Sequence, residues 1–328
     1  CNILSRMITE PRLVYKPFEY PKAADYWLKQ QQVHWLHTEV PLAQDLNDWN
    51  FNLQEHEKEI IGGILKGFAQ TETVVEDYWS SNVARWFKKP EIAAMARTFG
   101  SFETIHAAAY ALLNETLGLD NFAEFLEDEE TKAKIDSLLS INLESQNDWS
   151  SRAQSLAIFS GFTEGVNLYS SFAVLLSFKL RNLLKGVGQI IEWSVRDESL
   201  HSEGGCWLFK ELLSERPELK TKVLVKNIEQ AGHLSLGLEF NFIDKIFKNG
   251  DLENLKKEEL KNFMRHRVNT KMVDLGLDPI IPSSEIDKGA LKQMKWFDSV
   301  TAGQIQTDFF GSRVTQYSKG HFNWDDAF

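Results

Sequence analysis

The chain has 328 residues, of which 43% are hydrophobic, and its 36 basic and 47 acidic side chains give a formal net charge of −11. This composition excludes a disordered chain. An excess of acidic residues without a cluster of Lys and Arg argues against nucleic acid as the main partner. No stretch reaches the roughly 18 apolar residues of a membrane span, and the two cysteines, Cys1 and Cys206, are too few for a disulfide framework, so we expect a cytoplasmic protein with no membrane segment.

Helices are predicted along the chain, because apolar residues recur at spacings of three and four and no Asn-Gly or Asp-Gly signal joins alternating strands. Asn52 followed by Glu55 is typical of a capping box, and it predicts a helix that continues toward Trp79. Pro90 suits the first turn of the next helix, which runs to Leu117 and is capped by Gly118.

Beyond an acidic stretch at 127–130, residues 159–180 are apolar nearly all round, which predicts a buried helix. Three more helices are expected at about 187–213, 218–247 and 254–275. From about Ile281 the periodic pattern fails, and the composition of residues 311–328 cannot bury a face of its own. We therefore predict one all-α domain over residues 1–300 and a flexible C-terminal tail over 301–328.

Two of the eight histidines follow a glutamate by three residues, in Glu103-Thr-Ile-His106 and Glu198-Ser-Leu-His201. On a helix the two members of each pair share one face. Glu72 lies 31 residues before Glu103, and Glu164 lies 34 residues before Glu198. Each half of the chain thus supplies a lone Glu on one helix and Glu-x-x-His on the next, which is the ligand set of a carboxylate-bridged dimetal bundle of the ferritin-like kind.

Charge explains why these residue types belong together. Four carboxylates that meet in a dry interior would repel one another and protonate unless two divalent cations neutralised them. Oxygen ligands with one nitrogen per metal suit iron or manganese, whereas structural zinc sites favour thiolates. The alternative, that these are surface ion-pair residues, does not suit the apolar flanks of Glu103 and Glu164.

These motifs resemble those of the radical-generating small (beta) subunit of class I ribonucleotide reductase, and the resemblance covers the chain from about Phe18 to Phe328. The segment 101–110, Ser-Phe-Glu-Thr-Ile-His-Ala-Ala-Ala-Tyr, is similar to the family's ligand helix. The resemblance makes Tyr110 the radical-forming tyrosine and Asp197 the residue that links His106 to an indole. Trp35, in Val33-His-Trp-Leu36, matches the tryptophan of the family's electron-transfer path.

The resemblance also implies partners. In this family a flexible, acidic and aromatic C-terminus docks on the large catalytic subunit, and an upstream tyrosine relays the radical between subunits. Tyr317 and the ending 323–328, Asn-Trp-Asp-Asp-Ala-Phe, match that pattern. A homodimer is expected as well, which is reasonable on symmetry grounds.

One ligand departs from the family pattern. Most members have Asp at the first ligand position, where this chain has Glu72. Some relatives with Glu there resemble manganese-containing forms, in which the oxidant can be stored on the metals instead of on a tyrosine, whereas the presence of Tyr110 points the other way. The expected cofactor is therefore a dinuclear centre of two iron ions or a manganese-containing one, Mn/Fe or Mn/Mn.

The expected function is that of the small subunit of ribonucleoside-diphosphate reductase, which generates and stores the radical that the large subunit uses to make deoxyribonucleotides. By the resemblance the oxidant travels through His106, Asp197, Trp35 and Tyr317. The alternative is a ferritin-like dimetal oxidase or oxygenase that acts on a bound organic substrate. A purely structural or iron-storing bundle is a second alternative, in which Tyr110 and Trp35 would be incidental core residues.

Overall fold

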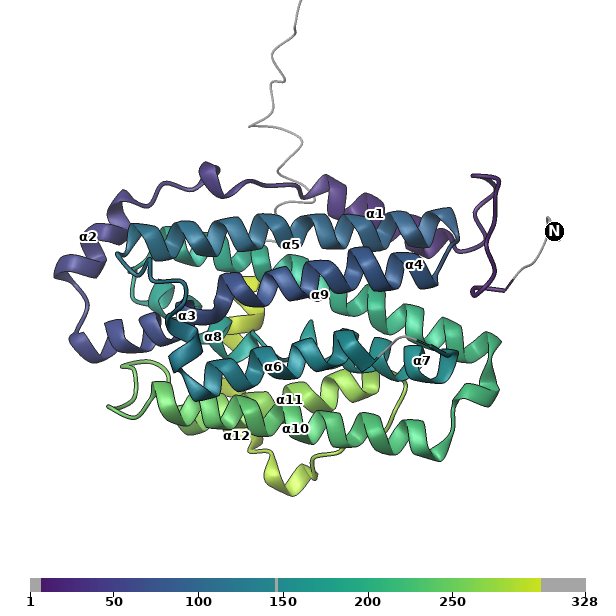
Figure 1. Ribbon diagram of the computed structural model, residues 1–328. Helices are drawn as coiled ribbons and strands as arrows, with labels where there is room; N and C mark the ends of the chain where they lie inside the picture. The colour runs from purple at the N-terminus through teal and green to yellow at the C-terminus, as the bar shows by residue number, and fades with distance from the viewer. Residues whose placement is uncertain (1–6, 145–146, 302–328) are drawn as a thin grey trace, which may run out of the picture.

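The computed structural model describes residues 7–144 and 147–301, and these form an elongated bundle of helices (Figure 1). Within these ranges no residue belongs to a β-strand, and Leu252 and Leu255 form an isolated bridge. The predicted all-α class is therefore confirmed. None of the described helices combines the length and the apolar composition that a membrane crossing requires.

The α-helices follow one another along the chain in the order α1 Pro21–Gln32, α2 Ala43–Phe51, α3 Glu55–Asp77, α4 Ala84–Trp86, α5 Pro90–Thr116, α6 Glu129–Glu144, α7 Trp149–Ile158, α8 Tyr169–Leu180, α9 Lys185–Glu215, α10 Lys222–Ile246, α11 Lys257–Asp274 and α12 Lys288–Gln293. Two π-helical segments interrupt them, η2 Tyr78–Val83 and η4 Phe159–Thr163. Short 3-10 turns lie at η1 His37–Glu39, η3 Glu124–Glu127, η5 Pro217–Leu219 and η6 Ser283–Glu285.

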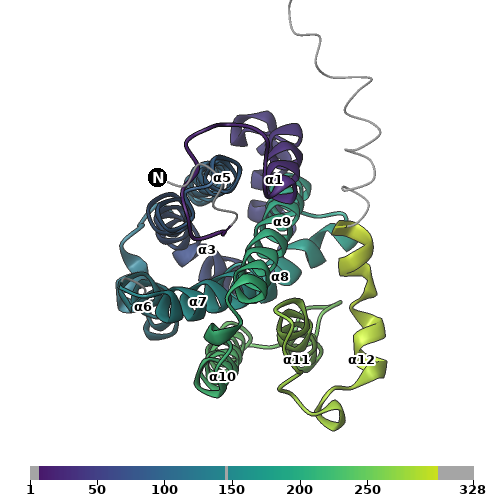
Figure 2. The same cartoon turned by 90° about the vertical axis from the view of Figure 1, so that its right-hand side faces the viewer.

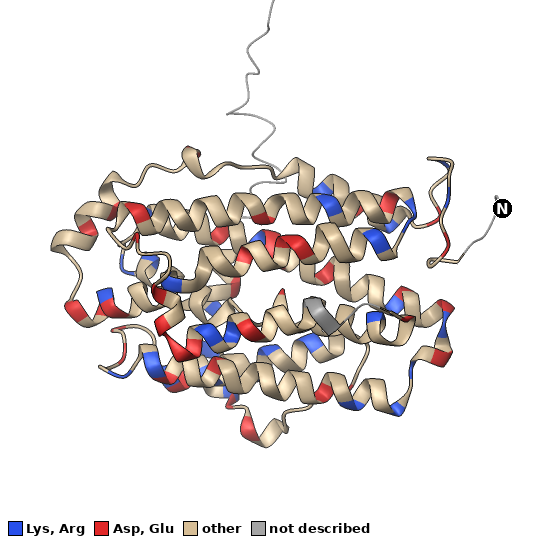
Figure 3. Cartoon of the chain, viewed as in Figure 1, with Lys and Arg blue, Asp and Glu red and all other residues tan. Residues whose placement is uncertain are grey.

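The end-on view shows how the helices are layered (Figure 2). Helices α3 and α5 pack along their lengths, α1 covers α5, and α8 lies against α9. Helices α6 and α7 continue the bundle below α3, α10 packs against both, and α11 and α12 lie to the other side of α10. Asp and Glu alternate with Lys and Arg over the visible helices and do not gather in one block (Figure 3).

The core runs between α3, α5, α8 and α9. Its apolar members include fully buried rings such as Trp79, Phe99 and Phe172. Helix α8 is buried on every side, as its uniform hydrophobicity predicts. At Gly205 on α9 an added Cβ would lie 2.1 Å from the Ser160 Oγ, so only glycine allows η4 to approach this closely.

Most predicted helices occur close to their expected bounds, including the one that starts at Pro90 and ends before Gly118, whose φ is +72°. Two expectations are wrong. Asn52 does not open α3: it caps the end of α2, and Gln54 with Glu57 forms the capping box instead. The stretch 159–180 is not one helix but breaks after η4 and resumes at Tyr169. Beyond Ile281, where the periodic pattern of the sequence fails, the chain forms the short elements η6 and α12.

Candidate metal centre

Four segments bring the predicted ligands to the centre of the bundle. Glu72 comes from the last turns of α3, the pair Glu103 and His106 from the middle of α5, and the pair Glu198 and His201 from the middle of α9. Glu164 follows directly after η4. All six side chains are buried, with at most 3% of their surface exposed. A surface ion-pair role, the simplest alternative, is therefore wrong.

The six residues form two overlapping groups of possible ligands. In each group one ligand atom per residue can be chosen so that all these atoms lie within 4.8 Å of one another. Glu103 and Glu198 belong to both groups and can therefore bridge two ions. The groups are Glu72, Glu103, His106 and Glu198, and Glu103, Glu164, Glu198 and His201.

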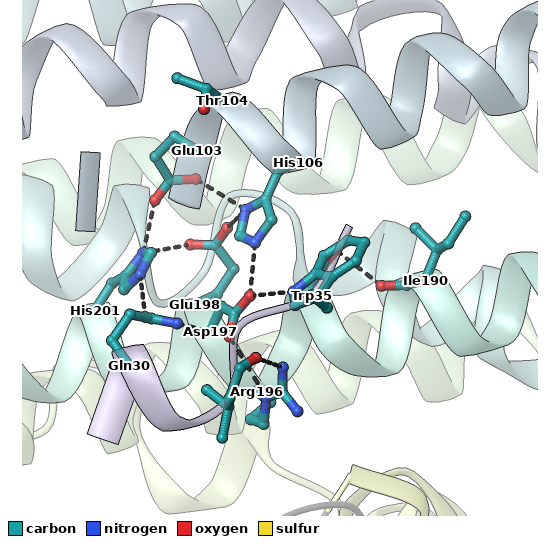
Figure 4. A network of polar contacts seen from close by, with 12 residues as sticks. Gln30, Trp35, Glu103, Thr104, His106, Ile190, Arg196, Asp197, Glu198 and His201 are labelled. Carbon is teal, nitrogen blue, oxygen red and sulfur yellow. Dashed lines mark hydrogen bonds and ion pairs between the residues drawn. The ribbon is translucent and has the colours of Figure 1, made fainter. Parts of the chain in front are cut away.

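Both imidazoles turn Nδ1 toward the carboxylates (Figure 4). The Nδ1 atom of His106 lies 2.9 Å from Glu103 Oε2 and 2.9 Å from Glu198 Oε1, and that of His201 lies 2.6 Å from Glu103 Oε1. Each Nε2 atom is held outside the cluster, by Asp197 for His106 and by Gln30 for His201. Metal-binding histidines are oriented in this way, with the second nitrogen fixed by a hydrogen bond.

The buried carboxylates lie close together, so positive charge at the cluster would stabilise them. Burial raises the pKa of Glu72 well above its usual range, and the charges of Glu198 and Glu103 raise it further. Burial and the same two neighbours raise the pKa of Glu164. Burial also acts to raise the pKa of Glu103, but the two imidazoles outweigh it and hold that pKa below its usual range. Glu72 Oε1 is buried without a hydrogen-bond partner among the described residues. These residues fit two divalent cations, which would bind the unpartnered oxygen and neutralise the rest.

Asp197 joins the cluster to an indole, as expected. Its Oδ2 atom lies 3.0 Å from His106 Nε2 and accepts a hydrogen bond of 2.8 Å from Trp35 Nε1. Burial acts to raise the pKa of Asp197, but the Arg196 charge and these two hydrogen bonds outweigh it, so the net shift is downward and the side chain is an anion. The Trp35 and His106 rings stack at 5.9 Å between centroids.

Tyr110 lies one turn beyond His106, with 6.3 Å between the ring centroids. The side chain is fully buried, and burial together with the Glu72 charge raises its pKa well above the usual range. Its hydroxyl has no hydrogen-bond partner among the described residues. The nearby Ser194 hydroxyl counters the rise in the Tyr110 pKa but donates to the Ile190 carbonyl at 2.9 Å. The Tyr110 phenol is therefore neutral and shielded from solvent.

The structure adds two residues that were not predicted. Gln30 on α1 accepts a hydrogen bond from His201 Nε2 through its Oε1 atom at 2.8 Å and donates one from Nε2 to Asp197 Oδ1 at 3.0 Å. It therefore ties both histidines into one network. Trp79 in η2 donates its indole N–H to Glu164. A glutamine or tryptophan within an ordinary helical pattern carries no sequence signal for such a contact. Tyr317 lies outside the described residues.

Comparison with known proteins places the chain among its relatives. A family model described as "Ribonucleotide reductase, small chain" matches residues 12–288. A "probable ribonucleoside-diphosphate reductase small subunit" of Invertebrate iridescent virus 6 is 31% identical, over 94% of this chain and 94% of that protein. The "ribonucleoside-diphosphate reductase subunit beta" of Chlamydia pneumoniae is 25% identical, over 94% of this chain and 91% of the relative.

Solved structures show the same fold. The "ribonucleotide reductase R2 subunit from Clostridium botulinum" superposes with a TM-score of 0.77 at 20% identity, covering 86% of this chain and 88% of that one. A Streptococcus sanguinis protein titled "dimanganese(II)-NrdF" gives a TM-score of 0.69 at 22% identity, covering 87% of this chain and 99% of the other. The expected ferritin-like bundle is thereby confirmed.

Proposed function

The chain belongs to the small-chain family of ribonucleotide reductase, and on this premise we propose how its buried cluster serves ribonucleoside-diphosphate reductase. The cluster assembles a dimetal centre, and the subunit generates a radical oxidant and passes it to the large catalytic subunit, which makes deoxyribonucleotides. The observation that carries the proposal is the pair of overlapping ligand groups that share Glu103 and Glu198 beside a shielded tyrosine. The family comparisons favour this function over an oxidase that acts on a bound organic substrate.

The ligands divide naturally between two ions. Glu72 and His106 would hold one ion, Glu164 and His201 the other, and Glu103 and Glu198 would bridge them. Iron or manganese bound there would supply the oxidising chemistry, by activating dioxygen or a reduced oxygen species. The carboxylates supply hard oxygen ligands, and their burial keeps bulk water away from the site.

Tyr110 stores the oxidant in this proposal. Because its pKa is raised, the phenol is neutral before oxidation, so its proton has to leave together with the electron. The surrounding rings, such as Phe68 at 4.9 Å between centroids, shield it from solvent and from reductants. Asp197 and Trp35 then form the exit path, since hydrogen bonds connect His106 to the indole without a gap.

The partner of the small subunit is the large catalytic subunit of the enzyme, and oligomerisation is expected of the family. We propose a homodimer, and we propose that residues 301–328 dock on the large subunit and carry Tyr317 to the interface. The acidic and aromatic ending of the sequence supports this assignment.

Electron paramagnetic resonance tests the proposal. After metal loading and exposure to oxygen, a tyrosyl signal that is absent from Tyr110→Phe would support a radical stored on the tyrosine. Activity with the large subunit that survives Tyr110→Phe, together with manganese in the protein, would place the oxidant on the metals and focus attention on Glu72. Trp35→Phe should keep the metals but lose reductase activity, whereas Trp207→Phe, a partly buried indole that contacts Tyr26, should keep both.

A further inference from the structure

The helix that carries Glu164 is broken at that residue. The Glu164 amide, directly after η4, donates to the Phe159 carbonyl at 3.0 Å, and the Asn167 amide donates to the Phe162 carbonyl at 2.9 Å. Both bonds span five residues, where a regular helix spans four. Regular helix resumes at Tyr169. We refer to residues 164–168 as the open turn.

Two backbone carbonyls of the open turn are bound by side chains. The carbonyls of Gly165 and Asn167 accept no backbone hydrogen bond within the described ranges. Arg267 on α11 donates its Nε–H to the Gly165 carbonyl at 2.5 Å. Lys134 on α6 donates to the Asn167 carbonyl at 2.8 Å. Helices α6 and α11 lie on different sides of α7 and α8 (Figure 2), so the turn is held from two directions.

Both cations are themselves fixed. The Lys134 ammonium lies 2.6 Å from Glu239 Oε1 and 4.5 Å from the centre of the Phe242 ring. The Arg267 guanidinium lies over the Tyr169 ring at 3.2 Å. Lys134 and Glu239 are 7% and 1% exposed, and a buried ion pair of this kind is seldom a net source of stability. Its place beside the open turn indicates that the ion pair positions the backbone of that turn.

The turn also leaves no room for a side chain at Gly165. An added Cβ at Gly165 would lie 2.3 Å from the Gly161 carbonyl oxygen and 2.6 Å from the Lys271 Cδ atom. Shortening the five-residue bond between the Glu164 amide and the Phe159 carbonyl to the regular span of four would rotate Glu164 by about 100° around the helix axis. Such a rotation would take the Glu164 carboxylate away from Trp79 and from His201.

We propose that Lys134 and Arg267 are positioning residues, which hold the open turn and thereby place the Glu164 carboxylate at its metal position. This inference rests on the dimetal function proposed above. Lys134 and Arg267 act on one of the two metal positions, because Glu164 belongs to only one ligand group. Outer residues that orient metal ligands typically contribute about 10- to 100-fold to metal affinity.

A manganese titration of the full-length, metal-free chain tests this, with free Mn²⁺ measured by electron paramagnetic resonance. In Lys134→Met and Arg267→Met we expect one of the two sites to weaken by about 10- to 100-fold, while the other stays within about threefold. The matched controls are Lys132→Met and Arg265→Met on the same helices, whose side chains contact Asp136 and Phe240 instead. Arg267→Lys retains charge and a donor and should recover part of the loss.

A double variant separates positioning from general damage. If Arg267 acts through Glu164, then Glu164→Ala and Glu164→Ala/Arg267→Met should give the same isotherm. Unchanged binding in both Met variants, equal weakening of both sites, or a further loss in the double variant would overturn the inference. A parent chain that does not bind two Mn²⁺ ions would instead refute the dimetal function on which the inference rests.

Hydrogen exchange provides a test that needs no variant. If Lys134 and Arg267 hold the open turn, the amides of residues 159–169 should be protected in the metal-free parent. Their exchange rates should lie within about tenfold of those of the amides in α8. Exchange at the rate of an unstructured peptide until metal is added would overturn the inference, because the metal and not the two cations would then order the turn.

Discussion

Asp197→Asn tests the network that joins the cluster to Trp35. The carboxylate is fully buried and each of its oxygens has two donors close by. Oδ2 faces His106 Nε2 and Trp35 Nε1, and Oδ1 faces Gln30 Nε2 and the Arg196 Nε–H at 3.4 Å. An amide keeps one acceptor oxygen, so two donors must face its NH₂ group whichever way it turns.

The expected cost follows from that count. A hydrogen bond to a charged group contributes about 1.5–3 kcal/mol, so losing two of them costs about 3–6 kcal/mol. Breaking a buried ion pair, here with Arg196, costs about 3–5 kcal/mol, which is the same order. Since the total free energy of unfolding of a folded protein is about 5–15 kcal/mol, replacing this one oxygen by an NH₂ group should destabilise the protein severely. Metal affinity at the His106 position should fall by about 10- to 100-fold, because the imidazole loses its outer partner.

Chemical denaturation of the metal-free protein measures the first effect, and a metal titration measures the second. Glu211→Gln, a partly exposed carboxylate on the same helix, serves as the control and should change the free energy of unfolding by less than about 0.5 kcal/mol. A loss below about 1 kcal/mol in Asp197→Asn, with unchanged metal affinity, would refute the reasoning.

Three further predictions concern single side chains. Tyr110→Phe should leave the free energy of unfolding unchanged or raise it by about 1 kcal/mol, because the buried hydroxyl has no partner; a loss above about 1 kcal/mol in denaturant titration would contradict this. Burial acts to raise the pKa of Glu91, but hydrogen bonds from Arg12 and the backbone outweigh it and lower that pKa below the ordinary 4.5. Its stabilisation is therefore present above that value and is lost as the pH falls, so Glu91→Gln should show a shallower loss of stability than the parent between about pH 5 and about pH 3, and equal slopes would disprove it. Gly165→Ala should cost about 1–3 kcal/mol or more because its Cβ meets backbone, whereas Gly237→Ala, which has open space within α10, should gain up to about 1 kcal/mol; equal melting temperatures would count against the tight turn.

The grouping of the candidate ligands could be predicted in part because its signal is local. Glu103 and His106 are three residues apart, and so are Glu198 and His201, so each pair must share a helix face wherever the helix lies. The structure brings both pairs together with Glu72 and Glu164, which the sequence suggested only by their similar distances along the chain.

The break in the helix at Glu164 could not be predicted. The stretch 159–180 is apolar on all sides, so its pattern has no period that could reveal an extra residue in one turn. Side chains from α6 and α11, far away in sequence, bind the carbonyls that the break releases. The start of α3 also differs from the predicted one, because the Asn52 side chain donates to Asp48 at 2.8 Å and belongs to the end of α2.

The central claim is that six buried side chains hold two metal ions that share Glu103 and Glu198. Elemental analysis of the chain purified from its native host, beside Glu103→Ala prepared in the same way, tests it most directly. The account predicts about two iron or manganese ions per chain in the parent and loss of both ions in the variant, since one bridging carboxylate serves both positions. A parent with no bound iron or manganese, or a variant that keeps both ions, would contradict it.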